Sequence, residues 1–163
     1  MGNRIFTVNA DMFFPGFVPD SFDVIWAEGS IYNLGFEKGL RACSILVKPQ
    51  GYIAVTEVCW LKIGAPEALT AFWEQEYPAI TDIQGNLNII KKCGLSLVDH
   101  FILPKSAWWE NYYKPLQEQI LLFREKYKND KTASDIINMT QLEIDIYKKF
   151  SDYYGYVFYV MQK

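Results

Sequence analysis

Phe22-Asp23-Val24-Ile25-Trp26-Ala27 is a nearly continuous apolar run, and Glu28-Gly29 closes it. Buried parallel strands have this pattern because helices cover both faces of their sheet, so we expect a buried strand over 22–27. The next segment, 36–47, has apolar residues at helical spacing and predicts a helix. The run at 52–58 predicts a second buried strand. The order strand, helix, strand indicates an α/β protein with a parallel sheet.

The same patterns predict the elements on either side. A short β-rich run at 5–8 predicts a strand, and Asp11 follows it at an acidic exit. No internal repeat or linker interrupts the chain, so we expect one domain over 1–163. The remaining expectations are helices over 66–77, 87–93 and 141–150, strands over 95–103 and 156–161, a helical stretch over 108–127 interrupted by Pro115, and a polar turn over 128–133.

The composition excludes several classes of protein. Half of the 163 residues are hydrophobic and 17% are aromatic, which is too apolar for a disordered chain. No apolar run approaches the roughly 20 residues that a membrane span needs, and residues 1–7 lack the pattern of a signal peptide. The formal net charge is −3 and the basic residues are scattered. We therefore expect a cytoplasmic protein that has neither a membrane nor a nucleic acid as its partner.

The cysteines and the single histidine give no sign of a metal site. Cys43, Cys59 and Cys93 are odd in number, far apart and without a CxxC pair. This usage favours three buried thiols over a disulfide framework or a zinc site. His100 has apolar neighbours within the predicted strand 95–103, so we expect no catalytic role for it. We expect no metal.

Two segments resemble the signature of class I S-adenosylmethionine-dependent methyltransferases. The first is Asp20-Ser21-Phe22-Asp23-Val24-Ile25, which resembles the family's "sFDxI" strand, and the second is Leu46-Val47-Lys48-Pro49-Gln50-Gly51-Tyr52, which resembles its "LkPgG" turn. The segment 29–37 is similar to the "GaiYniGFe" segment of a small-molecule subgroup, and 154–163 is similar to the family's final hairpin strand. Gln50 departs from the pattern, because the family usually has glycine there.

The resemblance implies a Rossmann-like methyltransferase fold, mostly parallel with a C-terminal antiparallel strand, in the order 3-2-1-4-5-7-6. The family begins with a strand, a GxGxG turn that approaches the cofactor and a strand that ends in an acidic residue. Nothing before Ile5 supplies these features, so we expect a truncated domain that lacks the first two strands of the fold. The absent contacts weaken binding by roughly 3–6 kcal/mol, so we expect this chain alone to bind S-adenosylmethionine weakly.

The resemblance also implies cofactor-binding residues. Asp11, followed by Met12, matches the family position whose carboxylate accepts a hydrogen bond from the adenine amine, although a loop aspartate can instead cap a turn. Ala27, Glu28 and Gly29 end a central parallel strand, where ligands of open α/β sheets bind. Glu28 is a candidate to hold the cofactor's ammonium group or to orient a substrate amine, or it simply faces water.

Other residues are candidates to meet the methyl acceptor. Tyr32 and Asn33 lie just beyond the strand end, where the family places groups that face the substrate, although Tyr32 also suits the core. Glu57 ends the next strand, with Trp60 shortly after it, and is a candidate substrate contact or general base. Many methyltransferases instead rely on alignment of the reacting atoms and have no dedicated base.

An aromatic cluster that includes Trp108 and Tyr112 follows the strand predicted over 95–103. Its rings either cover a flat substrate or the sulfonium by cation–π attraction, or pack on the sheet as part of the core. Both interpretations stay open.

We therefore expect an S-adenosylmethionine-dependent methyltransferase, or the C-terminal part of one, that acts on a small molecule. The alternative is a non-catalytic remnant that serves as a binding or oligomerisation module; another nucleotide-binding α/β fold is disfavoured because no phosphate-cradling loop is present. Without the first two strands, the strand 22–27 has an open edge that recruits another strand. A second copy, a separate chain or residues 5–8 could fill it, and we expect self-association.

Overall fold

The computed structural model describes residues 4–163, so residues 1–3 of the stretch that we examined for a signal peptide lie outside it. The chain divides into two compact units. The first, here the sheet unit, comprises Met1–Glu57, Gln84–His100 and Tyr159–Lys163. The second, here the helical unit, comprises Val58–Ile83 and Phe101–Phe158. The single domain over 1–163 stays a prediction.

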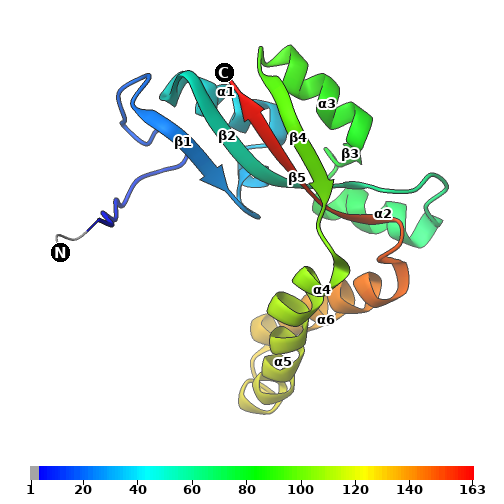
Figure 1. The fold of residues 1–163 in the computed structure, drawn as a ribbon. Helices are drawn as coiled ribbons and strands as arrows, with labels where there is room; N and C mark the ends of the chain where they lie inside the picture. The colour runs from blue at the N-terminus through cyan, green and yellow to red at the C-terminus, as the bar shows by residue number, and fades with distance from the viewer. Residues whose placement is uncertain (1–3) are drawn as a thin grey trace. The chain divides into compact units, whose positions relative to one another are not determined.

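Four strands lie in the order β1-β2-β5-β4. β1 pairs with β2 in parallel, with Ala27 opposite Val55. β5 runs the other way, because the Lys163 N–H donates to the Gly51 carbonyl at 3.1 Å, which joins the end of β5 to the start of β2. Figure 1 shows the arrows of β4 and β5 pointing in opposite directions. The bounds are Phe22–Ala27 for β1, Val47–Trp60 for β2, Ser96–Ile102 for β4 and Tyr154–Gln162 for β5, and a two-residue strand β3, Thr81–Asp82, pairs with the end of β2.

The expectation of a mostly parallel sheet is therefore wrong, because the sheet is mixed. β5 enters between β2 and β4 and makes both of its ladders antiparallel. The order agrees with strands 4-5-7-6 of the order that the resemblance implied, and the antiparallel C-terminal strand is confirmed. The apolar pattern of a buried strand carries no direction, so the pattern of β5 could not reveal which ladders it forms.

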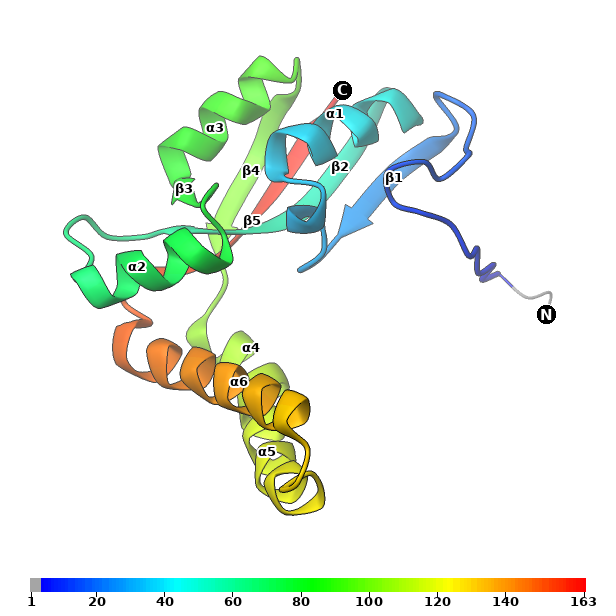
Figure 2. The same ribbon diagram turned by 180° about the vertical axis from the view of Figure 1, so that it is seen from behind.

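One face of β1 lies open within residues 4–163. Helices α1 (Phe36–Leu46) and α3 (Ile83–Lys92) cover the other face of the sheet (Figure 2). The strand 22–27 is confirmed at its predicted bounds, but Val24 and Trp26 are 52% and 63% exposed. The expected burial of both faces is therefore wrong, because no described helix packs on this side of β1.

A backbone turn within β2, where its pairing with β1 shifts register, contains the one departure from the family pattern. Gln50 has a φ of 66°, in the left-handed region that favours glycine, where the family usually has glycine. Gly51 next to it admits no side chain, because a Cβ there would lie 2.9 Å from the carbonyl oxygens of Asp23 and Lys48. The turn thus keeps its shape at the expense of backbone strain at Gln50.

The strand expected over 5–8 is wrong. Residues 4–10 form neither helix nor strand, and Ile5 and Phe6 are 77% and 86% exposed. An isolated strand leaves its backbone groups without partners, and within residues 4–163 no ladder includes these residues. Their apolar, β-branched pattern could not reveal whether a neighbouring strand exists. Residues 5–8, one of the three candidates to pair with the open edge of β1, therefore do not pair with it in this structure.

The helical unit contains a helix and a helical hairpin, and the stretch predicted with an interruption at Pro115 is continuous. Pro115 is the second residue of a helix that the π-helical turn over 109–113 enters directly, so Pro115 does not end the helical stretch. The polar turn expected over 128–133 is wrong at its end, because Asp130 accepts from the Ala133 N–H at 3.0 Å and starts a helix there. The bounds are Glu67–Glu76 for α2, Lys105–Trp108 for α4, Trp109–Tyr113 for η2, Lys114–Lys126 for α5 and Lys131–Phe150 for α6.

Aromatic side chains dominate the core of the helical unit. Tyr113 and Tyr154 are 1% exposed and Tyr147 is 4% exposed. The Trp108 ring lies against all three, with centroid separations of 4.9–5.9 Å. Rings of this size bury a large area and interact through their edges and faces, which stabilises so small a core. No helix within residues 4–163 has the length and apolar character that crossing a membrane requires.

Candidate functional site

The carboxyl end of β1 forms a short polar turn. Gly29 has a φ of 54°, and its N–H donates to the Thr56 hydroxyl of β2 at 2.8 Å. Ala27 is half-buried, whereas Glu28 is exposed and accepts from the indole N–H of Trp26 at 2.7 Å. The hydrogen bond to Thr56 holds the turn against β2, and the Glu28 carboxylate stands at the sheet edge where open α/β folds bind ligands.

The two substrate candidates next in the chain lie on a 3₁₀ helix, η1 (Ile31–Asn33). Ile31 anchors this turn, being 1% exposed and packed over Gly39, where a Cβ would meet its side chain at 2.4 Å. Tyr32 is 44% exposed, so it does not belong to the core. Asn33 donates from its side-chain amide to the Ser30 carbonyl at 3.0 Å. Both side chains therefore sit on the same edge of the sheet unit as Glu28.

Glu57 of β2 occupies a different environment from Glu28. It is 2% exposed, and its neighbour Thr56 is 4% exposed. A buried carboxylate is not placed to meet a ligand arriving from solvent at this edge. Thr56, which the sequence analysis missed, makes the contact that joins the end of β1 to β2. A hydroxyl within a buried strand, among apolar residues, was the available signal.

Asp11 caps a turn in this structure. Its carboxylate accepts from the Phe13 N–H at 2.9 Å, and its carbonyl accepts from the Phe14 N–H at 3.1 Å. Met12 is 45% exposed within that turn. The capping role that we considered for Asp11 is therefore observed, and its role toward adenine stays a prediction.

The remaining predicted residues lie in the helical unit. Trp60 and Trp108 are both half-buried and pack against the aromatic core. Tyr112 is 48% exposed, with its ring 5.0 Å from that of Tyr113. Of the two interpretations of the aromatic cluster, packing describes Trp108, whereas Tyr112 has a surface from which it could contact a ligand.

A carboxylate that the sequence analysis missed lies within this aromatic core. Glu143 of α6 is half-buried and accepts from the Tyr113 hydroxyl at 2.9 Å. Burial raises the pKa of Glu143, the hydrogen bond from Tyr113 opposes that shift, and the Glu76 carboxylate adds to it. Burial also raises the pKa of the Tyr113 hydroxyl. A desolvated carboxylate beside rings is a feature of binding and catalytic sites.

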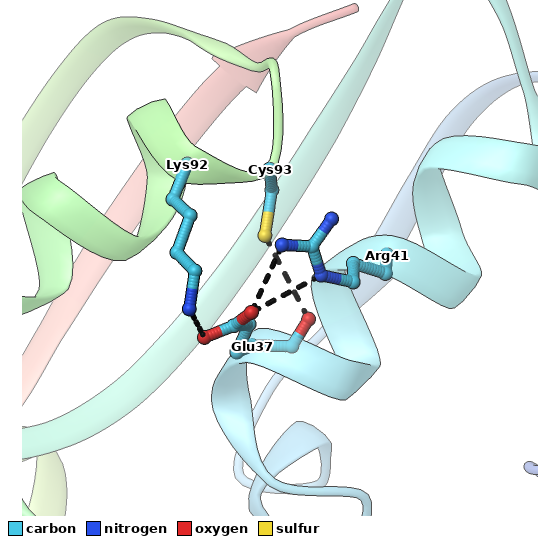
Figure 3. A network of polar contacts seen from close by, with 4 residues as sticks. All are labelled: Glu37, Arg41, Lys92 and Cys93. Carbon is cyan, nitrogen blue, oxygen red and sulfur yellow. Dashed lines mark hydrogen bonds and ion pairs between the residues drawn. The ribbon is translucent and has the colours of Figure 1, made fainter.

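A second polar cluster joins α1 to the end of α3 in the sheet unit. Figure 3 shows Glu37 between Arg41 and Lys92, which donate to its two oxygens at 2.9 Å each, and the Cys93 thiol 3.7 Å from the Glu37 carbonyl. These hydrogen bonds lower the pKa of Glu37, with Lys92 the largest cause. Burial raises the pKa of Cys93. The charges are matched and partly exposed, so this cluster ties two helices together.

The three cysteines are free thiols. Cys59 is buried, whereas Cys43 and Cys93 are half-buried, so the expected burial holds fully for Cys59 alone. Burial raises the pKa of Cys43 to about 11, which keeps it protonated at neutral pH. The imidazole of His100 stacks on Tyr159 at 6.0 Å.

No family model matches the sequence, and no curated protein matches it. The structure, in contrast, matches solved structures with sequence identities below 20%. A SAM-dependent methyltransferase from Geobacter sulfurreducens in complex with S-adenosyl-L-homocysteine gives a TM-score of 0.69 at 14% identity, over 87% of this chain and 58% of that chain. The [4+2]-cyclase SpnF gives 0.68 at 17% identity, over 94% and 54%.

A third match is a phosphoethanolamine N-methyltransferase 2 of Haemonchus contortus in complex with phosphomonomethylethanolamine and S-adenosylhomocysteine. It gives a TM-score of 0.67 at 18% identity, over 94% of this chain and 36% of that chain. The chain thus spans about half the length, or less, of these solved structures. Together these matches show that the chain has the fold of class I S-adenosylmethionine-dependent methyltransferases.

Proposed function

We propose that this chain is part of an S-adenosylmethionine-dependent methyltransferase that acts on a small molecule. The observation that carries the proposal is the strand order β1-β2-β5-β4 with β5 antiparallel, in which the polar turn at the carboxyl end of β1 bonds to Thr56 of the adjacent parallel strand β2. The fold alone does not decide the chemistry, because a [4+2]-cyclase shares it. The strand-end carboxylate and the resemblance of 20–29 to the family signature favour methyl transfer.

S-adenosylmethionine supplies a methyl group on a positively charged sulfonium centre. In the proposed site, Glu28 holds the cofactor's ammonium group, Ala27 and Gly29 shape the strand end, and Asp11 with Met12 faces the adenine. The Asp11 carboxylate already receives one N–H at 2.9 Å, and its second oxygen is the one available for the adenine amine. These residues fit part of the cofactor, because no acidic strand end for the ribose hydroxyls is among them.

For the methyl acceptor we propose Tyr32 and Asn33 as candidate contacts in the sheet unit and Trp60, Trp108 and Tyr112 as candidate contacts in the helical unit, each unit taken by itself. Tyr32 and Tyr112 support this role best, because each ring has about half of its surface exposed. Glu57 stays our candidate for the base that removes the acceptor's proton, although it is 2% exposed and an acceptor arriving from solvent does not meet it directly. Alignment of the acceptor with the methyl carbon carries most of the rate if no base is needed.

We also propose that a second polypeptide completes the cofactor site along β1. Val24 and Trp26 present an apolar face, and β1 is the edge of the sheet. An open apolar edge binds another strand readily. A second copy of this chain is the favoured occupant, and a separate chain that carries the rest of the fold is the alternative. Light scattering after size-exclusion chromatography tests the first.

We expect the chain to self-associate, and Val24→Lys to return it to a monomer. The matched control is Ile45→Lys, which places the same charge at a 59% exposed position on α1. A monomer at every concentration would rule out the second copy and leave the separate chain. Association that Val24→Lys leaves unchanged would exclude the β1 edge as the interface.

Isothermal titration with S-adenosylhomocysteine tests the function itself. We expect weak binding by dilute chain, tighter binding where the chain associates, and a loss of affinity of about tenfold in Glu28→Gln, since a charge-assisted hydrogen bond is removed. Glu74→Gln, an exposed carboxylate in the helical unit, is the control. No binding by the associated chain up to millimolar ligand would favour the alternative function, a non-catalytic binding or oligomerisation module.

A further inference from the structure

We infer that Glu143 and the rings around it in the helical unit bind the cationic head of a small amine. The inference deepens the proposed function, because it names a substrate class, and as a statement about the methyl acceptor it rests on that function. As a statement about a ligand of this cluster it stands by itself.

The cluster holds negative charge without a cation to balance it. Glu143 receives the Tyr113 hydroxyl at 2.9 Å, and the Glu76 carboxylate of α2 acts on it electrostatically. Within residues 4–163 no ion pair joins either carboxylate to a basic side chain. Lys148, on the same helix as Glu143, bonds Gln117 at 2.8 Å and lies 5.2 Å above the Trp109 ring. A half-buried carboxylate that lies near another carboxylate and has no ion pair favours a bound cation.

An unsatisfied hydroxyl points to a ligand independently of the charge. Tyr154 is 1% exposed, and its hydroxyl has no hydrogen-bond partner within residues 4–163. The Glu143 carboxylate acts on this phenol electrostatically, so the two lie in one neighbourhood. Buried polar groups almost always have a partner, and a lone one indicates a water, an ion or a ligand that completes it. A phenol oxygen can accept an N–H from an ammonium group.

The walls of the cluster select an organic cation. The Trp108 ring stacks on Tyr113 at 5.7 Å, and Tyr113 lies 4.7 Å from Tyr147. Aromatic faces attract ammonium groups and are the walls of known quaternary-ammonium sites. A metal ion prefers several carboxylate or imidazole ligands, and no group of three such side chains suited to a metal occurs within residues 4–163. The buried rings pack against one another, whereas the Tyr112 ring beside Tyr113 is 48% exposed, and this ring together with a single phenol-bonded carboxylate matches an amine better.

The route to Glu143 is on the surface of α6 and η2. Glu143 itself is half-buried, whereas Met139 one turn earlier is 54% exposed and Tyr112 is 48% exposed. Tyr112 lies beside Tyr113, with ring centroids 5.0 Å apart, and is one of the rings that the sequence analysis left open between a substrate contact and core packing. The remainder of the ligand would extend along these two exposed side chains toward solvent.

The test uses the full chain without cofactor and two probes of one shape. Choline carries the positive charge, and 3,3-dimethyl-1-butanol is its neutral isostere. We expect saturable quenching of tryptophan fluorescence by choline at millimolar levels, because Trp108 lies in the cluster, and at least about tenfold weaker binding of the alcohol. Equal binding of both probes, or a linear response without saturation, would overturn the inference; the second result would mean that water alone completes Tyr154.

Substitutions distinguish the contribution of the Glu143 carboxylate from that of the Tyr154 hydroxyl. Glu143→Gln keeps the shape and should weaken choline binding about tenfold, while Glu74→Gln, an exposed carboxylate on α2, should leave it unchanged. Tyr154→Phe removes a hydroxyl that has no partner among the described residues, so it should fold as well as the parent and should weaken methylammonium more than choline, which has no N–H. An unchanged affinity in Glu143→Gln would overturn the inference.

The two proposals fail separately. Choline binding together with no response to S-adenosylhomocysteine leaves the amine site standing and removes the methyl-transfer role. Binding of S-adenosylhomocysteine without choline binding removes only the amine.

Discussion

Glu37 and Glu143 are two carboxylates on helices, and their environments are opposite. Glu37 of the sheet unit lies between Arg41 and Lys92, and its pKa is lowered by their hydrogen bonds. Glu143 of the helical unit receives its hydrogen bond from a phenol, and burial raises its pKa. The first is satisfied by its own protein, whereas the second would be stabilised further by a cation. A carboxylate whose pKa is raised by burial, as that of Glu143 is, marks a candidate functional site.

Tyr113→Phe should give the largest change. The substitution keeps the ring and removes the phenol that donates to the half-buried Glu143 carboxylate, so we expect a loss of about 1–3 kcal/mol in the free energy of unfolding at pH 7. Urea unfolding measures it. Tyr127→Phe, at a ring that is 36% exposed, is the control and should stay within about 0.5 kcal/mol of the parent. Equal losses in the two variants would mean that the Tyr113 hydrogen bond adds nothing.

The pH dependence of Glu143→Gln should come next. The pKa of Glu143 is higher in the folded than in the unfolded chain, so ionisation opposes folding as pH rises past its ordinary value of 4.5. The variant should therefore gain stability relative to the parent between pH 4.5 and the raised pKa, by about 1.4 kcal/mol for each pH unit that separates the two values. Urea unfolding from pH 4 to 8 measures this. A difference that is constant with pH would contradict the raised pKa.

Glu37→Gln should show the opposite slope and a smaller change. The pKa of Glu37 is lowered in the folded chain, so its ionised form contributes stability above pH 4.5, and that contribution is lost as pH falls through the lowered pKa. The parent should exceed the variant in melting temperature at pH 7, and the two should converge as the pH falls through the lowered pKa of Glu37. If the variant melts at the parent's temperature at pH 7, the network of Figure 3 does not stabilise the fold.

The smallest expected effect is that of salt, which should weaken the stability contribution of Glu37 more than that of Glu143. The Debye length is about 3 Å in 1 M salt, so screening weakens the partly exposed pairs of Glu37 with Arg41 and Lys92. We expect the melting difference between parent and Glu37→Gln to shrink in 1 M sodium chloride. The cost of Tyr113→Phe should persist, because water and ions reach that hydrogen bond poorly. A parallel decrease in both would show that Glu143 is as open to solvent as Glu37.

Much of the fold could be predicted from local patterns. Hydrophobic periodicity gave the bounds of β1 and placed α1 within one residue of its end. It failed where the answer depends on a neighbour: residues 5–8 have the composition of a strand, yet no ladder within residues 4–163 includes them. The first half of α6 was missed because the Asp130 cap was overlooked among polar residues.

The candidate site divides in the same way. The rule that ligands bind beyond the carboxyl ends of parallel strands pointed to Ala27, Glu28 and Gly29. These residues could be found because they end or directly follow a strand that the sequence predicts. Glu143 could not be found in this way, because a glutamate on a polar helix looks ordinary until folding buries it against Tyr113. Trp108 shows the converse, since a ring in the core and a ring over a substrate have the same sequence signature.

The place of β5 has a consequence for how a nascent chain matures. β5, at residues 154–162, is synthesised after every other strand, yet it lies between β2 and β4. Until β5 leaves the ribosome, β2 and β4 both lack the strand that lies between them. Their unpaired edges stay open to chaperones or to premature pairing. Its contacts with Gly51 and Gln50 join residues more than 100 positions apart, a separation that slows folding. We therefore expect the sheet to close only after residue 162 has left the ribosome.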